Sequence, residues 1–108
     1  MAHIVRRRTK RRLMMAALHH GGPDLRLVLY VRMSGRCWYC GTEVALQEGT
    51  VDHVQPVVRG GTATLANTVF ACRACNREKG CLSLDQYREQ CGSGVFWGEA
   101  RAQERRRA

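Results

Sequence analysis

Two Cys-x-x-Cys motifs, Cys37 with Cys40 and Cys72 with Cys75, constrain the fold of this chain more than any other feature. A tight turn between two such cysteines points both thiols to one side, and four thiolates complete the tetrahedron that Zn²⁺ prefers. The 31 residues between the motifs leave room for a hairpin and a loop. The spacing therefore predicts one structural zinc site. Disulfides in an exported protein and redox-active thiols are the alternatives.

A structural metal suits a chain of this size. With 108 residues the sequence forms one small domain, in which a metal supplements a limited hydrophobic core. We expect a basic arm at residues 1–12, a globular domain at 13–98 and a basic tail at 99–108. Cys81 and Cys91 have no partner at the Cys-x-x-Cys spacing. Both are expected to be small buried residues.

Positive charge is concentrated at the two ends of the sequence. The formal net charge is +9, and most of the 18 basic residues are arginine. Residues 1–12 hold six bases and no acid, and residues 99–107 hold four arginines against two glutamates. Arginine makes planar, bidentate contacts with phosphate, so this pattern favours a polyanionic partner such as nucleic acid. Two solubilising tails are the alternative.

No apolar run in the sequence reaches the length of a membrane span. Residues 13–18 follow a basic start, but they are too few for the apolar region of a secretory signal and end in two histidines. We therefore expect a cytoplasmic protein of bacterial or phage type that does not associate with membranes. An organelle transit peptide in the arginine-rich start is the alternative.

The first half of the chain predicts two helices and a β-hairpin. Residues 10–18 form one candidate helix, and apolar residues recur at helical spacing from Leu25 to Met33 in the second. Residues 27–31 are also rich in strand-forming side chains, so a strand is the alternative there. Residues 42–46 and 50–56 are expected to pair as a hairpin across a glycine turn.

Two further helices are predicted in the second half. Residues 68–71 are expected to be a short apolar link into the second cysteine motif, where a helix begins and then ends before Gly80. Ser83, followed three residues later by Gln86, is typical of a capping box. It predicts a last helix that closes at Gly92.

Asp52, His53 and Asn76 are the candidate chemical residues. His53 lies between the two cysteine motifs, and Asn76 directly follows Cys75. If both motifs meet at one zinc ion, the segments that carry Asp52 and Asn76 come together. A carboxylate and an amide oxygen suit a hard cation such as Mg²⁺ or Mn²⁺ better than zinc. An ordinary strand end with a structural histidine is the alternative.

The motifs described above, taken in their order along residues 23–80, resemble those of a known family. The sequence resembles an HNH endonuclease of the four-cysteine zinc type. The matching residues are Cys37, Cys40, Asp52, His53, Pro56, Gly60, Gly61, Asn67, Cys72, Cys75, Asn76 and Lys79. The resemblance implies an α+β fold of the small ββα-metal, treble-clef-like type, zinc-stabilised and flanked by helices and basic tails. A hairpin and a helix would then hold one catalytic ion between them.

The resemblance also implies a role for each site residue. His53 matches the general base, and Asn67 matches the residue that holds the histidine-bearing loop in place. Asp52 and Asn76 match the ligands of a catalytic Mg²⁺ or Mn²⁺ ion. The position of Asn76 is often histidine in the family, and asparagine there makes a soft transition metal less suitable. The reaction so implied is phosphodiester hydrolysis with 5′-phosphate and 3′-hydroxyl products.

Basic and aromatic side chains flank the expected site. The candidate phosphate contacts are Arg59, Arg73, Arg77 and Lys79. Plain solvated charges are the alternative for each of them. Trp38 and Tyr39 are expected to pack within the fold rather than stack on bases. Phe96 and Trp97 are expected to pack onto the core.

The whole pattern predicts a metal-dependent endonuclease that acts on double-stranded DNA. A non-catalytic zinc module that binds nucleic acid is the first alternative. An interaction or toxin-like protein, with basic ends that bind RNA or membrane, is the second. Asp52, His53, Asn67 and Asn76 occur together, and a pure binding module needs none of them. Because the sequence shows no separate recognition segment, a protein partner is one expected source of specificity.

Overall fold

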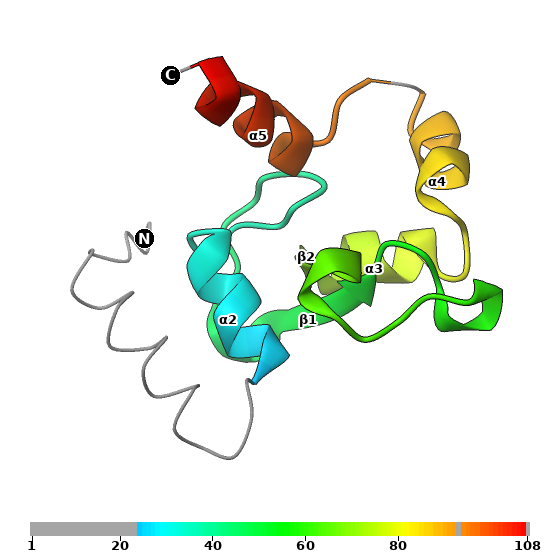
Figure 1. The fold of residues 1–108 in the computed structure, drawn as a ribbon, viewed down its shortest axis with the longest axis horizontal. Helices are drawn as coiled ribbons and strands as arrows, with labels where there is room; N and C mark the ends of the chain where they lie inside the picture. Colours follow the sequence, from blue (N-terminus) through cyan, green and yellow to red (C-terminus); the bar gives the residue numbers. More distant parts are fainter. Residues whose placement is uncertain (1–23, 93, 108) are drawn as a thin grey trace.

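The computed structural model describes residues 24–92 and 94–107 of the chain. At the centre of this part, two strands pair antiparallel: β1 (Gly49–His53) and β2 (Thr68–Cys72). Helices flank the pair, so the expected α+β class is confirmed (Figure 1). None of the described helices is both long and apolar enough to cross a membrane.

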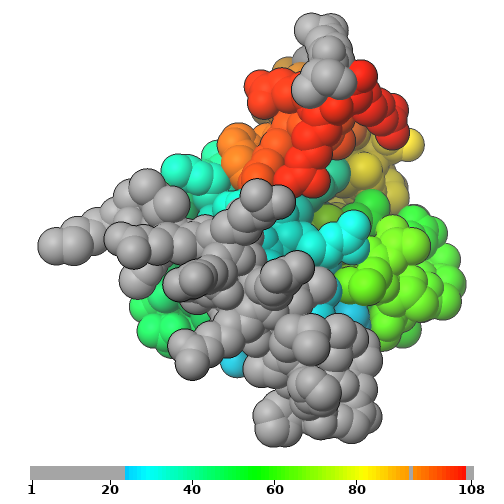
Figure 2. Space-filling view, turned by 60° about the vertical axis from the view of Figure 1, so that its left-hand side comes forward, coloured from blue at the N-terminus to red at the C-terminus, as the bar shows by residue number. Residues whose placement is uncertain are grey.

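The described part of the chain also contains four α-helices (Figure 1). Helix α2 (Leu25–Arg32) packs against both strands, and α3 (Arg73–Lys79) continues directly from β2. Helices α4 (Leu84–Gln90) and α5 (Trp97–Arg107) follow. Seen from another side, α5 lies at one end of the molecule, with α2 between it and the loop that follows β1 (Figure 2). The basic tail expected from residue 99 onward therefore begins inside α5.

The helix expected around Leu25 is confirmed as α2. Asp24 caps it, because its side chain accepts hydrogen bonds from the backbone N–H groups of Arg26 and Leu27. The cap satisfies N–H groups that have no partner within the helix. Residues 28–31 are all buried. Burial against the strands therefore accommodates the β-branched residues that also suited a strand.

The expected hairpin between residues 42–46 and 50–56 is wrong. Strand β1 pairs with β2, whose residues were expected to be a link. Residues 42–46 contribute only an isolated bridge between Glu43 and Arg36. Residues 68–71 are all buried, and a strand buried on both faces lacks the alternation that marks a strand in sequence. The uniformly apolar sequence of β2 therefore did not identify it as the strand that pairs with β1.

The two helices expected in the second half are confirmed. Helix α3 ends at Lys79, and Gly80 follows with a positive φ of 51°. The capping box of α4 is complete, because Ser83 and Gln86 each accept a hydrogen bond from the backbone N–H of the other. Helix α4 ends at Gln90, slightly before the expected Gly92.

Aromatic side chains form the core between the first cysteine motif and the last two helices. The rings of Tyr87 and Phe96 stack with centroids 5.6 Å apart, and Tyr39 meets both edge-on. Trp38 packs against the same cluster. The expectation that Trp38 and Tyr39 pack within the fold is confirmed, as is the packing of Phe96 onto the core.

The expected burial of Cys81 and Cys91 is wrong, since both are exposed. Cys91 is the C-terminal cap of α4, and Cys81 follows the glycine that ends α3. Both lie at helix ends, where the chain turns at the surface. Their thiols therefore belong neither to the core nor to the four-cysteine motif pair.

An ion pair joins the last two helices. Arg88 of α4 donates two hydrogen bonds to the carboxylate of Glu99 in α5, at 2.7 and 2.9 Å. Glu99 also accepts a hydrogen bond of 3.0 Å from the backbone N–H of Phe96. The hydrogen bonds from Arg88, together with that from Phe96, lower the pKa of Glu99 below its ordinary value of 4.5, although burial opposes the shift.

Replacing Glu99 with glutamine removes the charge and keeps the acceptor. We expect the free energy of unfolding at pH 7 to fall by about 0.5–1 kcal/mol. A carboxylate whose folded pKa is lowered stabilises the protein above its unfolded pKa, and this stability is lost as the pH falls through the folded pKa. The difference between wild type and E99Q should therefore shrink below pH 4.5. Urea unfolding across this range measures it.

The matched control is Glu104→Gln, which changes an exposed glutamate of the same helix that forms no ion pair with another described residue. This variant should unfold like the wild type at every pH. An equal loss of stability in E99Q and E104Q would contradict the assigned role of the Arg88–Glu99 pair.

Candidate active site

The four cysteines of the two motifs converge. Their Sγ atoms all lie within 4.8 Å of one another, and those of Cys40 and Cys72 are 3.9 Å apart. Zinc–thiolate bonds of about 2.3 Å in a tetrahedron place the sulfur atoms about 3.8 Å from each other. The expectation that both motifs meet at one point is confirmed, and the spacing of the thiols fits a zinc ion.

Backbone hydrogen bonds bring the two motifs together. The N–H of Trp38, inside the first motif, donates to the carbonyl of Phe70 in β2 at 2.9 Å. Phe70 precedes Cys72 by two residues, so this bond aligns the first motif beside the start of the second. Gly41 closes the first turn with φ of 77°, which only glycine adopts readily. The N–H of Gly41 donates to the carbonyl of Cys37 at 2.9 Å.

The thiols do not all ionise easily by themselves. Burial raises the pKa of the Cys37 and Cys75 thiols above the ordinary value of 9.0. Burial opposes ionisation of Cys40 as well, but hydrogen bonds with Thr42, Cys37 and Cys75 outweigh it and lower that pKa to about 7. Thiolates are the form that binds a metal, and a bound cation favours the charged form. Four thiols in such surroundings are a donor set for a soft divalent cation.

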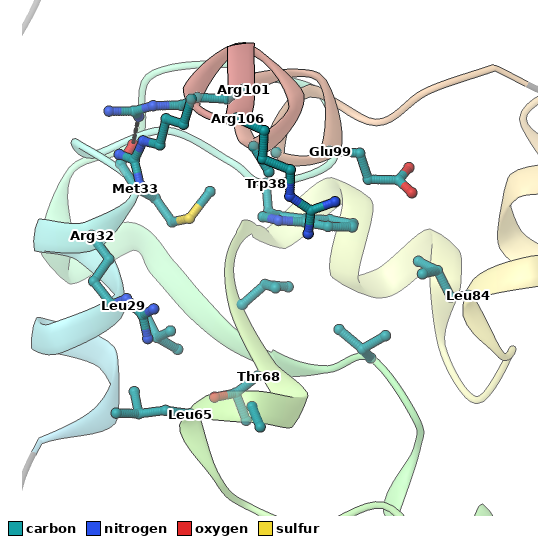
Figure 3. A pocket seen from close by; sticks show the side chains of 16 residues that line it. Leu29, Arg32, Met33, Trp38, Leu65, Thr68, Leu84, Glu99, Arg101 and Arg106 are labelled. Atoms are coloured by element: carbon teal, nitrogen blue, oxygen red, sulfur yellow. Dashed lines mark hydrogen bonds between the residues drawn. The ribbon is translucent and has the colours of Figure 1, made fainter. Parts of the chain in front are cut away.

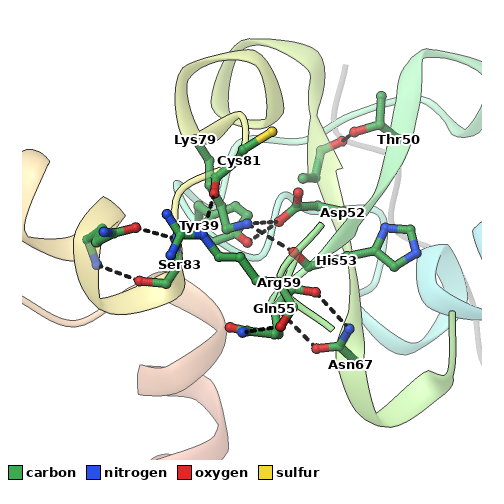
Figure 4. A network of polar contacts seen from close by, with 12 residues as sticks. Tyr39, Thr50, Asp52, His53, Gln55, Arg59, Asn67, Lys79, Cys81 and Ser83 are labelled. Carbon is green, nitrogen blue, oxygen red and sulfur yellow. Dashed lines mark hydrogen bonds and ion pairs between the residues drawn. The ribbon is translucent and has the colours of Figure 1, made fainter. Parts of the chain in front are cut away.

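Asp52 is the centre of a buried polar network (Figure 4). The residue is only 4% exposed. The hydroxyl of Tyr39 donates a hydrogen bond to Oδ2 of Asp52, and the ammonium of Lys79 lies 3.4 Å from the same oxygen. Burial, followed by the hydrogen bond to Asp52, raises the pKa of Tyr39, so the phenol stays protonated and donates. The first cysteine motif thereby contacts the carboxylate directly.

Lys79 connects α3 to β1. Its side chain is buried, and its ammonium donates a hydrogen bond of 2.9 Å to the backbone carbonyl of His53. The same ammonium pairs with Asp52. Lys79 therefore fixes both the carboxylate and the backbone of the neighbouring histidine. A phosphate contact, which was expected of Lys79, would require an exposed ammonium, and the structure buries it.

His53 ends β1, and its imidazole points away from the Asp52 network (Figure 4). The imidazole makes no hydrogen bond with any described side chain or backbone group. His53, Asp52 and Asn76 border one open cavity of about 340 Å³, together with Pro56 and Gly80. The structure therefore brings the three expected chemical residues to one cavity, from the end of β1 and from α3.

Asn76 lies in the middle of α3 and is half-buried. Its side-chain amide makes no hydrogen bond within the part of the chain that the structure describes. Oδ1 of Asp52 likewise has no partner there, whereas Oδ2 has two. Asp52 and Asn76 both line the cavity, and each has a side-chain oxygen without a described partner, a pair that suits a hard cation.

Asn67 holds the loop that follows His53. Its side-chain amide donates to the carbonyls of Gln55 and Thr62 at 3.1 and 2.9 Å, and its oxygen accepts from the N–H of Gln55 at 2.9 Å. All polar groups of the side chain are thus engaged by backbone. A side chain on Gly61 would meet the carbonyl oxygen of Gln55 at 1.7 Å, so the loop closes only around glycine. These contacts support a positioning role for Asn67.

The remaining basic candidates are exposed. Arg59 donates from Nε to the carbonyl of Cys81 at 3.1 Å, which ties the loop after β1 to the turn after α3. Arg73 and Arg77 are exposed residues of α3 without a hydrogen bond to another described residue. These three side chains stay candidates for phosphate contacts.

Tyr39 is the site residue that the sequence did not reveal. It was assigned to packing, which the structure confirms, but its hydroxyl also donates a hydrogen bond to Asp52, a candidate metal ligand. The available signal was its place inside a cysteine motif that was expected to lie beside the site. The tertiary fold decides where a side chain points, so the Cys-x-x-Cys spacing could not predict the hydrogen bond from Tyr39 to Asp52.

Residues 37–81 match the model of the family described as HNH endonuclease. The matched segment contains the four-cysteine cluster, β1, β2 and α3, so the resemblance to the HNH endonuclease domain covers residues 37–81.

A known protein and two solved structures are similar to this chain. The CRISPR-associated endonuclease Cas9 of Corynebacterium diphtheriae is 36% identical over 50 residues, which are 45% of this chain and 5% of that protein. The type II-C Cas9 enzyme from Actinomyces naeslundii matches 91% of this chain and 11% of its own, with a TM-score of 0.63 and 24% identity. Streptococcus thermophilus Cas9, in complex with the AGAA PAM, matches 90% of this chain over 12% of its own length, with a TM-score of 0.58 and 20% identity. The structural likenesses show the fold.

Replacing Lys79 with methionine tests the buried network. The change leaves the carboxylate of Asp52 without its cation, and loss of one member of a buried ion pair costs about 3–5 kcal/mol. We expect this loss in the free energy of unfolding, measured with denaturant on the zinc-loaded protein. The control is Arg77→Met, an exposed residue of the same helix turn, which should cost less than about 0.5 kcal/mol. Equal effects of the two substitutions would contradict the role of Lys79.

Proposed function

We propose that this protein is a metal-dependent endonuclease that hydrolyses phosphodiester bonds in double-stranded DNA. The observation that carries the proposal is the meeting of His53, Asp52 and Asn76 at one open cavity within an HNH endonuclease domain. The imidazole of His53 has no described hydrogen-bond partner, so it is available to a reactant. The similarity to Cas9 of Corynebacterium diphtheriae, which is described as an endonuclease, and to the Cas9 enzyme of Actinomyces naeslundii supports cleavage of nucleic acid as the reaction.

His53 acts as the general base in this proposal. The neutral imidazole takes a proton from a water molecule, which then attacks the phosphorus in line with the departing 3′ oxygen. The products carry a 5′-phosphate and a 3′-hydroxyl group. Lys79 holds the backbone of His53, and Asn67 holds the loop beyond it, so the backbone that carries the imidazole is held in place. Such positioning is part of how general bases reach their reactants.

The proposed catalytic cation is Mg²⁺ or Mn²⁺. Oδ1 of Asp52 and the side-chain oxygen of Asn76 would hold it, because both are hard oxygen ligands that border the cavity and lack other described partners. When bound, the cation supplies positive charge for the pentavalent phosphate and the leaving oxygen. The hydroxyl of Tyr39 and the ammonium of Lys79 engage Oδ2, which leaves Oδ1 to face the cation.

A structural zinc ion is the second proposed cofactor. The four cysteines would hold it, and binding energy of about 10 kcal/mol or more is available to small zinc domains. Zinc would thereby fix the first motif against α3, and with it the contact between Tyr39 and Asp52. The zinc ion has no part in the chemistry, since four thiolates close its coordination sphere.

The zinc proposal predicts one zinc ion per chain. Cys72→Ser should lose the ion and unfold cooperatively at a much lower denaturant concentration, because the metal contributes folding energy. Cys81→Ser and Cys91→Ser, which change exposed thiols, are the matched controls and should keep both zinc and stability. Elemental analysis by mass spectrometry and denaturant unfolding give the two readouts. A zinc-free protein that folds normally would refute the proposal.

The nuclease proposal predicts nicking of supercoiled plasmid DNA in the presence of Mg²⁺. His53→Ala should lower the rate by about 10²–10⁴-fold, the usual contribution of a general base. The alanine keeps the backbone carbonyl that accepts from Lys79, so zinc content and unfolding should match the wild type. Asn76→Ala should raise the Mg²⁺ concentration needed for half-maximal cleavage.

Divalent cations should be withdrawn by dialysis and restored by addition, because a strong chelator also removes the proposed zinc. Full cleavage by folded H53A would overturn the assignment of the base. Tight DNA binding without any cleavage by the zinc-loaded wild type would instead identify a non-catalytic zinc module. Parallel reactions with linear DNA, single-stranded DNA and RNA define the substrate.

A further inference from the structure

A second and larger cavity lies between α2, the turn at Leu65–Asn67 and α5 (Figure 3). Its volume is about 620 Å³, and it shares no lining residue with the cavity of His53. Apolar side chains form much of its wall, among them Leu29, Met33 and Trp38. Helices α2 and α5 and the loop after β1 border one side of the molecule (Figure 2). We call this cavity the α2–α5 groove.

Four arginines line the α2–α5 groove. Arg32 comes from α2, and Arg101, Arg105 and Arg106 come from α5; Arg32 and Arg106 lie on two different sides of it (Figure 3). Arg32, Arg105 and Arg106 make no hydrogen bond or ion pair with another described residue. The lining acid, Glu99, is already paired with Arg88. The groove therefore presents uncompensated positive charge beside an apolar wall.

Arg101 lies between α5 and the residues that follow α2, close to other arginines. Its guanidinium donates to the carbonyl of Met33 at 3.3 Å and to Oγ of Ser34 at 3.1 Å, and lies 5.2 Å from the ring centre of Trp97. Burial, and then the charges of Arg105 and Arg36, lower its pKa below the ordinary value of 12.5. The fold thus holds like charges together, and an anion between them would relieve the repulsion.

The charge of the groove selects its occupant. Residues 1–12 carry six bases and no acid, and a second copy of the chain carries a net charge of +9, so neither supplies the negative charge that the arginines lack. A polyanion is attracted. The faces of the bases are stacked inside a duplex but accessible in a single strand, and grooves that bind single strands combine arginines with apolar and aromatic walls. A single strand matches both the arginines and the apolar wall.

We propose that the α2–α5 groove binds a single-stranded segment of nucleic acid, with phosphates on the arginines and bases against the apolar wall around Trp38. Val54 lines the groove and directly follows His53 in sequence. Thr68 and Val69, which also line it, pair across the sheet with His53 and Asp52. A strand in the groove thus lies along the end of the sheet that carries the active-site candidates. The proposal goes beyond the nuclease function, and its test needs no cleavage.

The test compares two arginines of the same helix. Arg32 and Arg26 are both exposed in α2, but only Arg32 lines the groove. Affinity for fluorescent oligothymidylate and oligouridylate of about 12 nucleotides is measured by anisotropy, with zinc-loaded full chain and without added Mg²⁺. Arg32→Gln should weaken binding about two- to fivefold, the loss expected for one exposed ionic contact. Arg26→Gln should leave it nearly unchanged.

Salt dependence supplies a second readout. Each lost phosphate contact should reduce the slope of log affinity against log salt by about 0.7 for a single strand. Arg32→Gln and Arg106→Gln together should therefore flatten the slope by about 1.4. Leu65→Asp, at a side chain that is 42% exposed and lines the groove, should weaken binding while thermal unfolding stays unchanged. The DNA and RNA oligonucleotides distinguish the two sources of single strand.

Three results would overturn the proposal. Equal losses in R32Q and R26Q would show that net charge alone acts. Displacement of the oligonucleotide by polyglutamate at the same charge concentration would remove the role of the bases and favour an acidic protein partner. A change of sedimentation in R32Q without a change of affinity would identify a self-association surface. Since H53A retains the groove, loss of binding and loss of cleavage are measured separately, and either proposal can fail without the other.

Discussion

Four cysteine thiols that come from both ends of a 31-residue stretch lie within 4.8 Å of one another, and the site depends on that convergence. The first motif bonds to β2 through Trp38 and Phe70, and β2 leads directly into α3. Asn76 reaches the cavity from α3, whereas His53 reaches it from β1. A small domain has little core with which to hold such segments in place, so a metal bound by the four thiols would supply much of the missing rigidity.

The buried contacts of Asp52 connect the first cysteine motif to the candidate active site. A carboxylate that is 4% exposed is stable only with partners, and here they come from the first cysteine motif and from α3. Tyr39 and Lys79 occupy one carboxylate oxygen and leave the other without a described partner. The same lysine holds the carbonyl of His53. Scaffold and site are therefore coupled by three hydrogen-bonded side chains rather than by proximity alone.

Positive charge is distributed unevenly around this centre. Arg73 and Arg77 are exposed on α3, which reaches the candidate catalytic cavity, whereas four arginines line the α2–α5 groove on other elements. The strand pair contributes residues to both places, because Asp52 and His53 border the catalytic cavity and their cross-strand partners line the groove. In the proposed function, a polyanion would therefore have two places of contact on one small domain, one of them at the arginines of α5.

The sequence by itself determined features that depend on neighbours along the chain. The Cys-x-x-Cys spacing, the capping box of Ser83 and Gln86 and the end of α3 at Gly80 are set by local backbone geometry, and the structure bears them out. The order of the motifs also predicted the HNH resemblance, and residues 37–81 match that family's model. Only the tertiary structure decided that β1 pairs with β2, that Lys79 is buried, that Tyr39 bonds Asp52 and that Cys81 and Cys91 are exposed. These features depend on which distant segments meet and on where each side chain then points, and the periodicity of a single segment records neither.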